Sequence, residues 1–272
     1  MARLAFITGA SSGIGQALAA ALAREGCALA LVARDVAPIE AWAQREGLPA
    51  SAWRAYAADV AVVDRIVAAG QACLEQQGVP DLVVACAGIS VGMDSAERED
   101  LDVYARMLAI NNVGLAATFH PFIRPMRARG SGTLVGVASV NGIRGFPGHG
   151  AYGSSKAAVI AYCESLRGDL RGTGVRVLTV CPGYVDTPLT RGNRHGMPFL
   201  LSPEAFARRF LRVLRSGTSY AVIPWQMAIV AKLLRLLPNA WFDRLFAGRA
   251  RKPRQAELRA RATPKQKGPE GP

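Results

Sequence analysis

The chain has 272 residues, half of them hydrophobic, and a formal net charge of +13. This length suits one α/β domain with an extension and allows a large buried core. No stretch of about 20 apolar residues lacks charges, so we expect no membrane-spanning helix, and we expect no export signal at the N-terminus.

Short apolar runs alternate with helical patterns along residues 1–224. Continuous apolar runs are typical of strands covered on both faces of a parallel sheet. They lie at residues 4–8, 28–33, 53–58, 82–87, 133–138, 175–180 and 220–224. Helical patterns lie at residues 13–24, 64–77, 96–108, 112–129, 151–171 and 203–214. The alternation predicts an α/β fold, a Rossmann-like doubly wound parallel sheet of about seven strands, in one domain.

The first predicted strand ends in a glycine-rich turn. Thr8 precedes Gly9, Gly13 and Gly15, and a helical pattern begins within this turn. Glycines allow the backbone to approach a pyrophosphate closely, and the free N–H groups at the start of a helix bind anions. A strand before the turn and a helix after it are the context that a dinucleotide-binding motif requires.

A second motif carries proton chemistry. Tyr152 and Lys156 are one helical turn apart, so their side chains share a face, and Ser139 ends a predicted buried strand. A nearby ammonium should lower the pKa of the tyrosine, ordinarily about 10, towards neutrality. The phenol could then donate a proton to a carbonyl as hydride arrives, or withdraw one in the oxidative direction. Ser139 would hold the substrate oxygen.

With these motifs the chain resembles the short-chain dehydrogenase/reductase family over about residues 3–224. The resemblance implies hydride exchange with a nicotinamide cofactor, and it adds Asn111 to the catalytic residues Ser139, Tyr152 and Lys156. The chain departs from the family's Asn-Asn-Ala-Gly strand end at Ala85 and Cys86, which affects hydrogen bonds on the adenine side. The glycine turn and the resemblance together indicate these cofactor-binding residues: Thr8, Gly9, Ser11, Ser12, Gly13, Ile14, Gly15, Arg34, Asp59, Val60, Ala87, Gly88, Tyr152, Lys156, Pro182, Gly183, Val185 and Thr187.

The end of the second predicted strand bears on cofactor choice. An acid there accepts a hydrogen bond from the ribose 2′-OH of NAD, whereas an arginine pairs with the 2′-phosphate of NADP. By the family's register, Ala33 occupies the place of the acid and Arg34 that of the phosphate-binding residue. Asp35 could supply the acid after a shift of the loop, so NAD remains an alternative cofactor. Ser12 stands where many NADP-dependent relatives carry a basic residue. We favour NADP(H) over NAD(H).

The expected function is a carbonyl reductase activity, the NADP(H)-dependent interconversion of a ketone or aldehyde and its alcohol. Substrate choice should lie in residues 90–98, 140–150 and 187–202. Ile143, Phe146 and residues 197–201 favour a lipophilic substrate, and Arg144 fits a solvated loop better than an acidic substrate. The alternative is a cofactor-binding regulator or scaffold of the same fold without turnover. The resemblance also implies a homodimer or homotetramer formed through residues 112–129 and 151–171.

The last quarter of the chain carries most of the charge. Residues 208–272 contain 15 Lys and Arg against 3 Asp and Glu. We expect an amphipathic helical extension at 225–248 and a disordered basic tail at 249–272. The extension could pack over the active site or on another subunit, or it could contact anionic membrane peripherally through 226–272. Nucleic-acid binding is not favoured, because no reading motif is present.

The five cysteines, Cys27, Cys73, Cys86, Cys163 and Cys181, have no paired spacing. They are expected to be free thiols in a cytoplasmic protein. The histidines are scattered and show no ligand spacing, so no metal site is expected.

Overall fold

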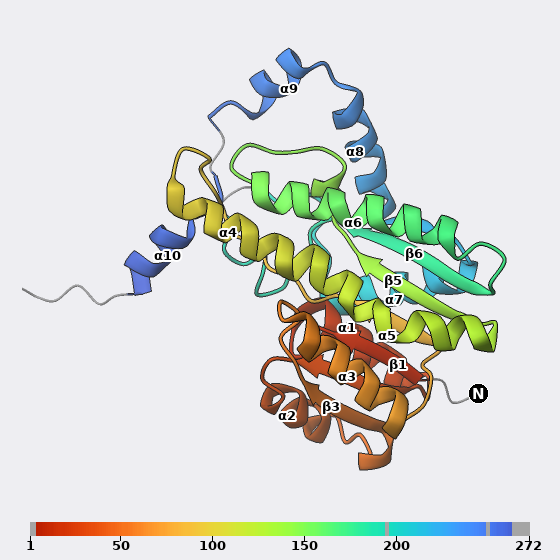
Figure 1. Ribbon diagram of the computed structural model, residues 1–272. Coiled ribbons are helices and arrows are strands. Elements are labelled where there is room, and N and C mark those ends of the chain that lie inside the picture. The colour runs from red at the N-terminus through yellow and green to blue at the C-terminus, as the bar shows by residue number, and fades with distance from the viewer. Residues whose placement is uncertain (1–3, 194–195, 249–250, 263–272) are drawn as a thin grey trace, which may run out of the picture.

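The computed structural model describes residues 4–193, 196–248 and 251–262, and it is built around one parallel sheet (Figure 1). The sheet has seven strands in the order β3-β2-β1-β4-β5-β6-β7, and every neighbouring pair is parallel. The strands are β1 (Leu4–Thr8), β2 (Ala28–Ala33), β3 (Trp53–Ala57), β4 (Leu82–Ala85), β5 (Gly132–Val137), β6 (Val175–Pro182) and β7 (Tyr220–Ile223). This topology confirms the predicted doubly wound fold.

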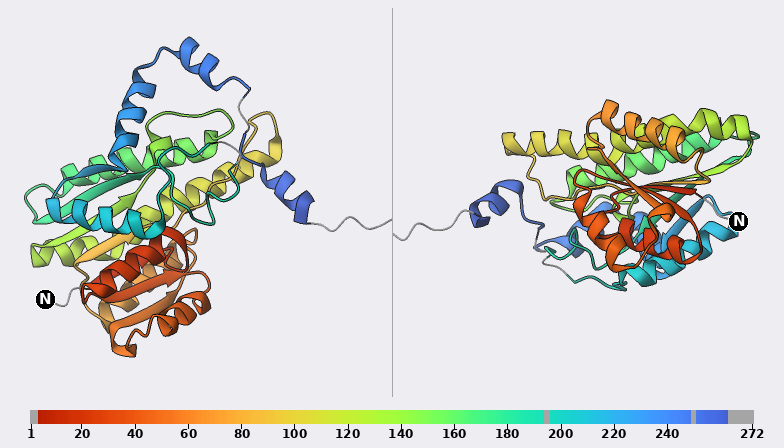
Figure 2. Two further views of the ribbon diagram at one scale, coloured as in Figure 1. Left: turned by 180° about the vertical axis from the view of Figure 1, so that it is seen from behind. Right: turned by 90° about the horizontal axis from the view of Figure 1, so that it is seen from below.

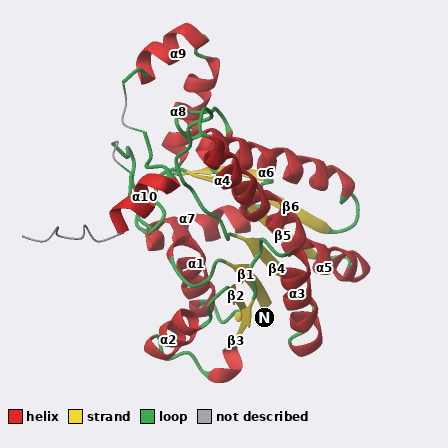
Figure 3. Cartoon of the chain, turned by 60° about the vertical axis from the view of Figure 1, so that its left-hand side comes forward, coloured by secondary structure: helices red, strands yellow, loops and turns green. Residues whose placement is uncertain are grey.

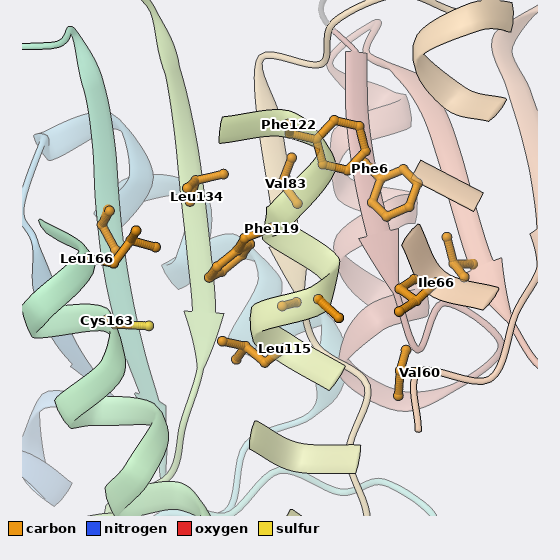
Figure 4. Packing of buried hydrophobic residues seen from close by; sticks show 14 of the residues in the cluster. Phe6, Val60, Ile66, Val83, Leu115, Phe119, Phe122, Leu134, Cys163 and Leu166 are labelled. Carbon is orange, nitrogen blue, oxygen red and sulfur yellow. The ribbon is translucent and has the colours of Figure 1, made fainter. Parts of the chain in front are cut away.

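Helices cover both faces of the sheet (Figure 2). One face packs on α1 (Gly13–Arg24), α2 (Ala37–Arg45) and α7 (Pro203–Ser216). The other packs on α3 (Val63–Gln76), α5 (Gly114–Arg129) and α6 (Gly150–Asp169). Alternate residues of β1 enter the two cores, Phe6 on one side and Ile7 on the other. Figure 4 shows Phe6 against Phe122 of α5, with ring centroids 4.7 Å apart.

Most predicted elements are present with shifted ends. α2 was not predicted, because its buried face is only Ile39, Trp42 and Ala43. Also not predicted were the π-turn at Ala109–Val113, which joins α4 (Arg98–Leu108) to α5, and short 3₁₀ turns at Ala50–Ala52 and Val140–Gly142. Ser202 caps α7, since its Oγ accepts a hydrogen bond from the Ala205 amide at 3.1 Å.

Beyond the sheet the chain forms an arch of two helices, α8 (Trp225–Leu236) and α9 (Asn239–Phe246), which stands over α6 (Figures 1 and 3). The inner side of α8 buries Met227 and Ala231. Phe242 and Phe246 of α9 contact Phe146, with ring centroids 5.8 and 5.1 Å away. The extension therefore packs on the α/β domain of its own chain.

The chain then returns to the body of the protein. Residues 251–254, which we call the strap, contact the segment after β4 and the start of α4, and α10 (Gln255–Ala262) follows. The expectation of a disordered tail is wrong for residues 251–262. Residues 251–254 are held by ion pairs and hydrogen bonds to residues far away in the chain, and these contacts need no apolar surface. Residues 249–250 and 263–272 lie outside the described residues.

Candidate active site

The loop between β1 and α1 borders a cavity of about 300 Å³. Gly9 and Gly13 have φ angles of 71° and 57°, which glycine adopts without steric cost. A Cβ on Gly15 would lie 2.2 Å from the carbonyl oxygen of Gly9. Only a glycine lets α1 begin directly on the loop. Gly13, Ile14 and Gly15 line the cavity, so the unpaired N–H groups of the first helical turn border a space where a pyrophosphate fits.

Most of the other predicted cofactor residues reach this cavity from the carboxyl ends of the strands, where parallel sheets bind their ligands, whereas Tyr152 and Lys156 reach it from α6. The lining includes Gly9, Ser11, Ser12, Arg34, Asp59, Val60, Ala87, Gly88, Tyr152, Lys156, Pro182, Gly183, Val185 and Thr187. Thr8 lies behind this surface. It is buried, and its Oγ1 accepts hydrogen bonds from the Cys86 and Ala87 amides at 3.1 and 3.3 Å. Thr8 thus joins β1 to the end of β4, where the chain departs from the family's asparagines.

Arg34 and Asp35 follow β2 and have different surroundings. Arg34 is exposed and lines the cavity. Asp35 is also exposed, but its Oδ1 accepts a hydrogen bond from the Ala37 amide at 3.0 Å. This bond holds the carboxylate at the start of α2, whereas the guanidinium of Arg34 borders the cavity.

Ser139, Tyr152 and Lys156 meet at the opposite end of the same cavity. Lys156 is 5% exposed; its Nζ donates to the Val137 carbonyl at 2.8 Å and lies 6.0 Å from the centre of the Tyr152 ring. Ser139 Oγ accepts a hydrogen bond from the Asn141 amide at 3.2 Å, which fixes its orientation.

Burial is the main cause of the pKa shifts of Tyr152 and Lys156. It raises the pKa of Tyr152 above its ordinary value, and a hydrogen bond with Ser139 opposes the rise. Burial also lowers the pKa of Lys156 to about 8. The predicted lowering of the tyrosine pKa by its lysine neighbour is therefore wrong in this structure. A charged lysine is itself costly in this buried position, and its Nζ is bonded to a backbone carbonyl.

Asn111 sits in the π-turn and is fully buried. Its Oδ1 accepts from the Ile89 amide at 2.8 Å, and its Nδ2 donates to the Ile89 carbonyl and to Ser155 Oγ, both at 3.0 Å. A Cβ on Gly88 would lie 3.2 Å from Asn111 Oδ1 and 3.5 Å from Lys156 Nζ. Asn111 thus joins the end of β4 to α6 beside the lysine, behind the cavity lining.

A second cavity of about 270 Å³ adjoins the first. Both are lined by Ser139, Tyr152, Gly183, Leu189 and Thr190. All three predicted substrate segments contribute to the second cavity, through residues that include Ser90, Phe146, His149, Asn193 and Pro198. Of residues 197–201, which were expected to favour a lipophilic substrate, Phe199 and Leu200 are about half exposed and Leu201 is buried.

Arg144 is neither a solvated loop residue nor a cavity residue. Its guanidinium donates to the carbonyls of Leu234 and Leu237, the second at 2.6 Å, and lies 4.0 Å from the centre of the Phe242 ring. These are orphan carbonyls at the end of α8, which a cation caps favourably. Arg144 therefore fastens the arch over the second cavity, and the expectation of a solvated side chain is wrong.

Two sets of lining residues were not predicted as site residues. Met227, Val230, Leu234 and Phe246 form an apolar wall from the arch, and Lys252 comes from the strap. The apolar periodicity of residues 226–237 was a usable signal for the first set. Local sequence held no signal for Lys252, because its position depends on contacts with residues far away along the chain.

A parallel sheet with a glycine-turn cavity and an adjoining Ser-Tyr-Lys group defines a Rossmann-type oxidoreductase. Residues 3–198 match the family model described as short chain dehydrogenase. The chain belongs to the short-chain dehydrogenase family, and it is an NAD(P)-dependent oxidoreductase.

Several known proteins are similar to this chain. An uncharacterized oxidoreductase of Myxococcus xanthus is 36% identical over 241 residues, covering 89% of this chain and 95% of that protein. An alcohol dehydrogenase from the archaeon Thermococcus sibiricus, complexed with 5-hydroxy-NADP, is 29% identical with a TM-score of 0.74, covering 82% of this chain and 96% of that chain. A short-chain dehydrogenase/reductase from Burkholderia phymatum in complex with NAD shares the fold at 23% identity and a TM-score of 0.77, covering 85% and 92%.

Proposed function

We propose that this protein is an NADP(H)-dependent reductase or dehydrogenase that interconverts a lipophilic ketone or aldehyde and its alcohol, with Tyr152 as general acid and base. One observation carries the proposal. Ser139 and Tyr152 line both cavities, so the groups that can bind and protonate a carbonyl oxygen lie where the glycine-turn cavity adjoins a second cavity with an apolar wall from the arch.

The chain's residues fit a nicotinamide dinucleotide. The glycine turn leaves backbone N–H groups for its pyrophosphate, and Pro182, Gly183, Val185 and Thr187 border the end beside Tyr152. A bound nicotinamide supplies or accepts the hydride. Ser139 would donate a hydrogen bond to the carbonyl oxygen, and Tyr152 would give up its proton as negative charge develops there. Lys156, when protonated, stabilises the tyrosinate that results.

Cofactor preference rests on Arg34. Replacing Arg34 with Gln is expected to raise the KM for NADPH about tenfold to a hundredfold, because a charge-assisted hydrogen bond to phosphate is lost. The KM for NADH should change little. Initial rates with both cofactors measure this. Arg45→Gln, an exposed arginine of α2, is the matched control, and equal losses with both cofactors in Arg34→Gln would oppose the assignment.

The pH profile of reduction depends on Lys156. Its pKa of about 8 leaves the amine protonated below that pH and neutral above it. We therefore expect kcat/KM for reduction to be level below about pH 8 and to fall as pH rises further, as the cation beside the phenol is lost. In Lys156→Arg the charge persists at high pH, so the alkaline fall should disappear, whatever the absolute rate. An unchanged profile in this variant would assign the fall to another group.

The exposed face of the arch supports peripheral membrane contact. It presents large apolar side chains at helical spacing, Trp225, Ile229, Leu233, Leu236, Trp241 and Leu245, which are 48–80% exposed. Lys232, Arg235 and Arg244 lie exposed among them, as in helices that bind anionic bilayer surfaces. Within the described ranges, no helix has the length and hydrophobicity to span a bilayer.

Co-sedimentation with vesicles of mixed phosphatidylserine and phosphatidylcholine tests this contact. Replacing the 80% exposed Leu236 with Asp is expected to weaken binding about tenfold, since one large apolar side chain leaves the interface and a negative charge enters. Leu101→Asp, at an exposed position on α4, should bind as the wild type does. Equal sedimentation of all three proteins would exclude the arch as the binding surface.

The proposed activity is tested by screening ketones and aldehydes of increasing chain length while NADPH and NADH absorbance is followed in parallel. Turnover that improves with chain length supports the reductase. Cofactor binding without turnover across the screen would support the scaffold alternative. Analytical ultracentrifugation of the same sample tests the proposed homodimer or homotetramer, whose interface we place on α5 and α6.

A further inference from the structure

The strap is fastened by a buried ion pair. Arg254 Nε lies 2.7 Å from Asp100 Oδ2, and its Nη2 lies 2.9 Å from Glu99 Oε1. Asp100 is fully buried and also accepts a hydrogen bond from the Asp94 amide at 2.7 Å. Burial would raise the pKa of Asp100, but the bonds from Arg254 and the Asp94 amide hold it below its usual range. A buried carboxylate needs such a partner, so Arg254 has a defined place.

Close backbone packing fixes the register of the strap. The Gly92 amide donates to the Pro253 carbonyl at 3.0 Å. A Cβ on Gly92 would lie 1.9 Å from the Lys252 carbonyl oxygen, so the strap lies flat against this glycine. With Arg254 anchored and Gly92 underneath, Lys252 has little freedom to leave its position.

This register buries the side chain of Lys252 in the wall of the second cavity. The residue is 9% exposed, and its Nζ donates to Ser90 Oγ and to the Leu189 carbonyl, both at 3.0 Å. Both acceptors are neutral, and the ion pairs found among the described residues do not include Lys252. An ammonium has three donors, and a buried cation without a counter-charge is unfavourable. Burial accordingly lowers its pKa to about 8.

The composition of the cavity shows where an anion would lie. Among the described lining residues, Lys252 is the only lysine, arginine or acidic residue, and His149 is the other group that can become cationic. Leu189, whose carbonyl holds the ammonium, lines both cavities together with Tyr152. The cation therefore lies near the junction where the carbonyl would react, while Met227, Val230 and Leu234 of the arch leave apolar space beyond.

We propose that Lys252 binds the carboxylate of the substrate, which is an oxo- or hydroxycarboxylic acid with a hydrocarbon tail. This inference rests on the proposed function and narrows it to one substrate class. The ammonium selects the acid and holds it beside Ser139 and Tyr152, and the arch covers the tail. Arg254 is a positioning residue, because it acts only through the strap.

Turnover of matched pairs tests this assignment. Medium-chain 2-oxo and 4-oxo acids are each compared with their methyl esters, which keep the ketone and tail but lack the charge. Wild type should favour an acid over its ester by about tenfold to a hundredfold in kcat/KM, as expected for a charge-assisted hydrogen bond. Lys252→Met should remove this preference, so that kcat/KM for the acid falls to about the level of its ester. Equal rates for acid and ester in wild type, or equal losses for both in Lys252→Met, would overturn the proposal.

Binding without turnover separates this inference from the redox proposal. Calorimetric titration with decanoate and with decanol should show decanoate bound more tightly by wild type and the difference lost in Lys252→Met. That result would support the carboxylate contact even if no ketone were turned over. Equal affinities for decanoate and decanol would contradict the contact without contradicting the proposed reductase activity.

Arg251→Met is the matched control, because it removes one positive charge from the same strap. Arg251 is exposed and pairs with Asp94 at 3.7 Å, away from the cavity lining. It should keep the wild-type preference for acids, and thermal melting should show all three proteins folded. A loss of acid preference in Arg251→Met as large as in Lys252→Met would show that only the net charge of the strap matters, and would overturn the assigned contact.

Discussion

Replacing Tyr152 with Phe is expected to lower kcat for carbonyl reduction by about 10²–10⁴-fold, the range for loss of a general acid. The ring remains, so the cavity keeps its shape, and only the hydroxyl that bonds with Ser139 is removed. NADPH affinity, measured by fluorescence titration, should stay within about threefold of wild type, because the glycine turn and Arg34 are untouched. The variant would thus lose substrate turnover and keep cofactor binding.

Tyr162→Phe is the control for this experiment. It removes a phenolic hydroxyl from the same helix, α6, at a position that packs against the core on the side of Cys163 and lines neither cavity among the described residues. Its rate should be close to that of wild type. If Tyr152→Phe turned over ketones as fast as Tyr162→Phe, another group would have to supply the proton, and the assignment of the general acid would be wrong.

The sequence predicted the sheet well because its central strands are buried on both faces. Residues 4–8 and 28–33 were assigned with the observed ends, since continuous apolar runs bounded by a glycine turn or a charged loop have few alternatives. The spacing of Tyr152 and Lys156 also carried over directly, because one turn of helix fixes which side chains share a face.

Other parts of the site depend on contacts that no local pattern records. The strap contains no large apolar side chain and is rich in basic residues, so its composition indicated disorder. It is ordered by Asp100, which lies 154 positions earlier in the chain and is fully buried. Arg144 is a similar case, since its partners are the last carbonyls of α8. Long-range polar partners of this kind override what composition suggests.

The sequence also did not predict the direction in which the pKa of Tyr152 is shifted. The helical spacing places an amine near the phenol, and on that basis a lowered tyrosine pKa was expected. The direction of the shift depends instead on burial, which raises the pKa of Tyr152 and lowers that of Lys156. Sequence spacing reports which groups are neighbours, whereas the depth of the cavity decides which of their charged forms is tolerated.

Replacing Gly15 with Ala is expected to reduce NADPH affinity by at least about a hundredfold, and turnover at low cofactor concentration with it. The added Cβ would lie 2.2 Å from the Gly9 carbonyl oxygen and 2.7 Å from the Gly9 carbonyl carbon. Both atoms belong to backbone held by β1, so no side chain can move aside. The start of α1 must shift instead, and the N–H groups that border the pyrophosphate space shift with it.

Gly168→Ala is the matched substitution for this prediction. Gly168 lies in α6, where an added Cβ meets nothing within 4 Å, so alanine should leave cofactor affinity unchanged and stabilise the helix by up to about 1 kcal/mol. Calorimetric titration with NADPH and thermal melting of both variants distinguish a loss of the pyrophosphate-binding turn from a loss of folding. A Gly15→Ala protein that melts near wild type yet does not bind NADPH is the expected result. One that binds the cofactor normally would mean that the pyrophosphate does not rest on this turn.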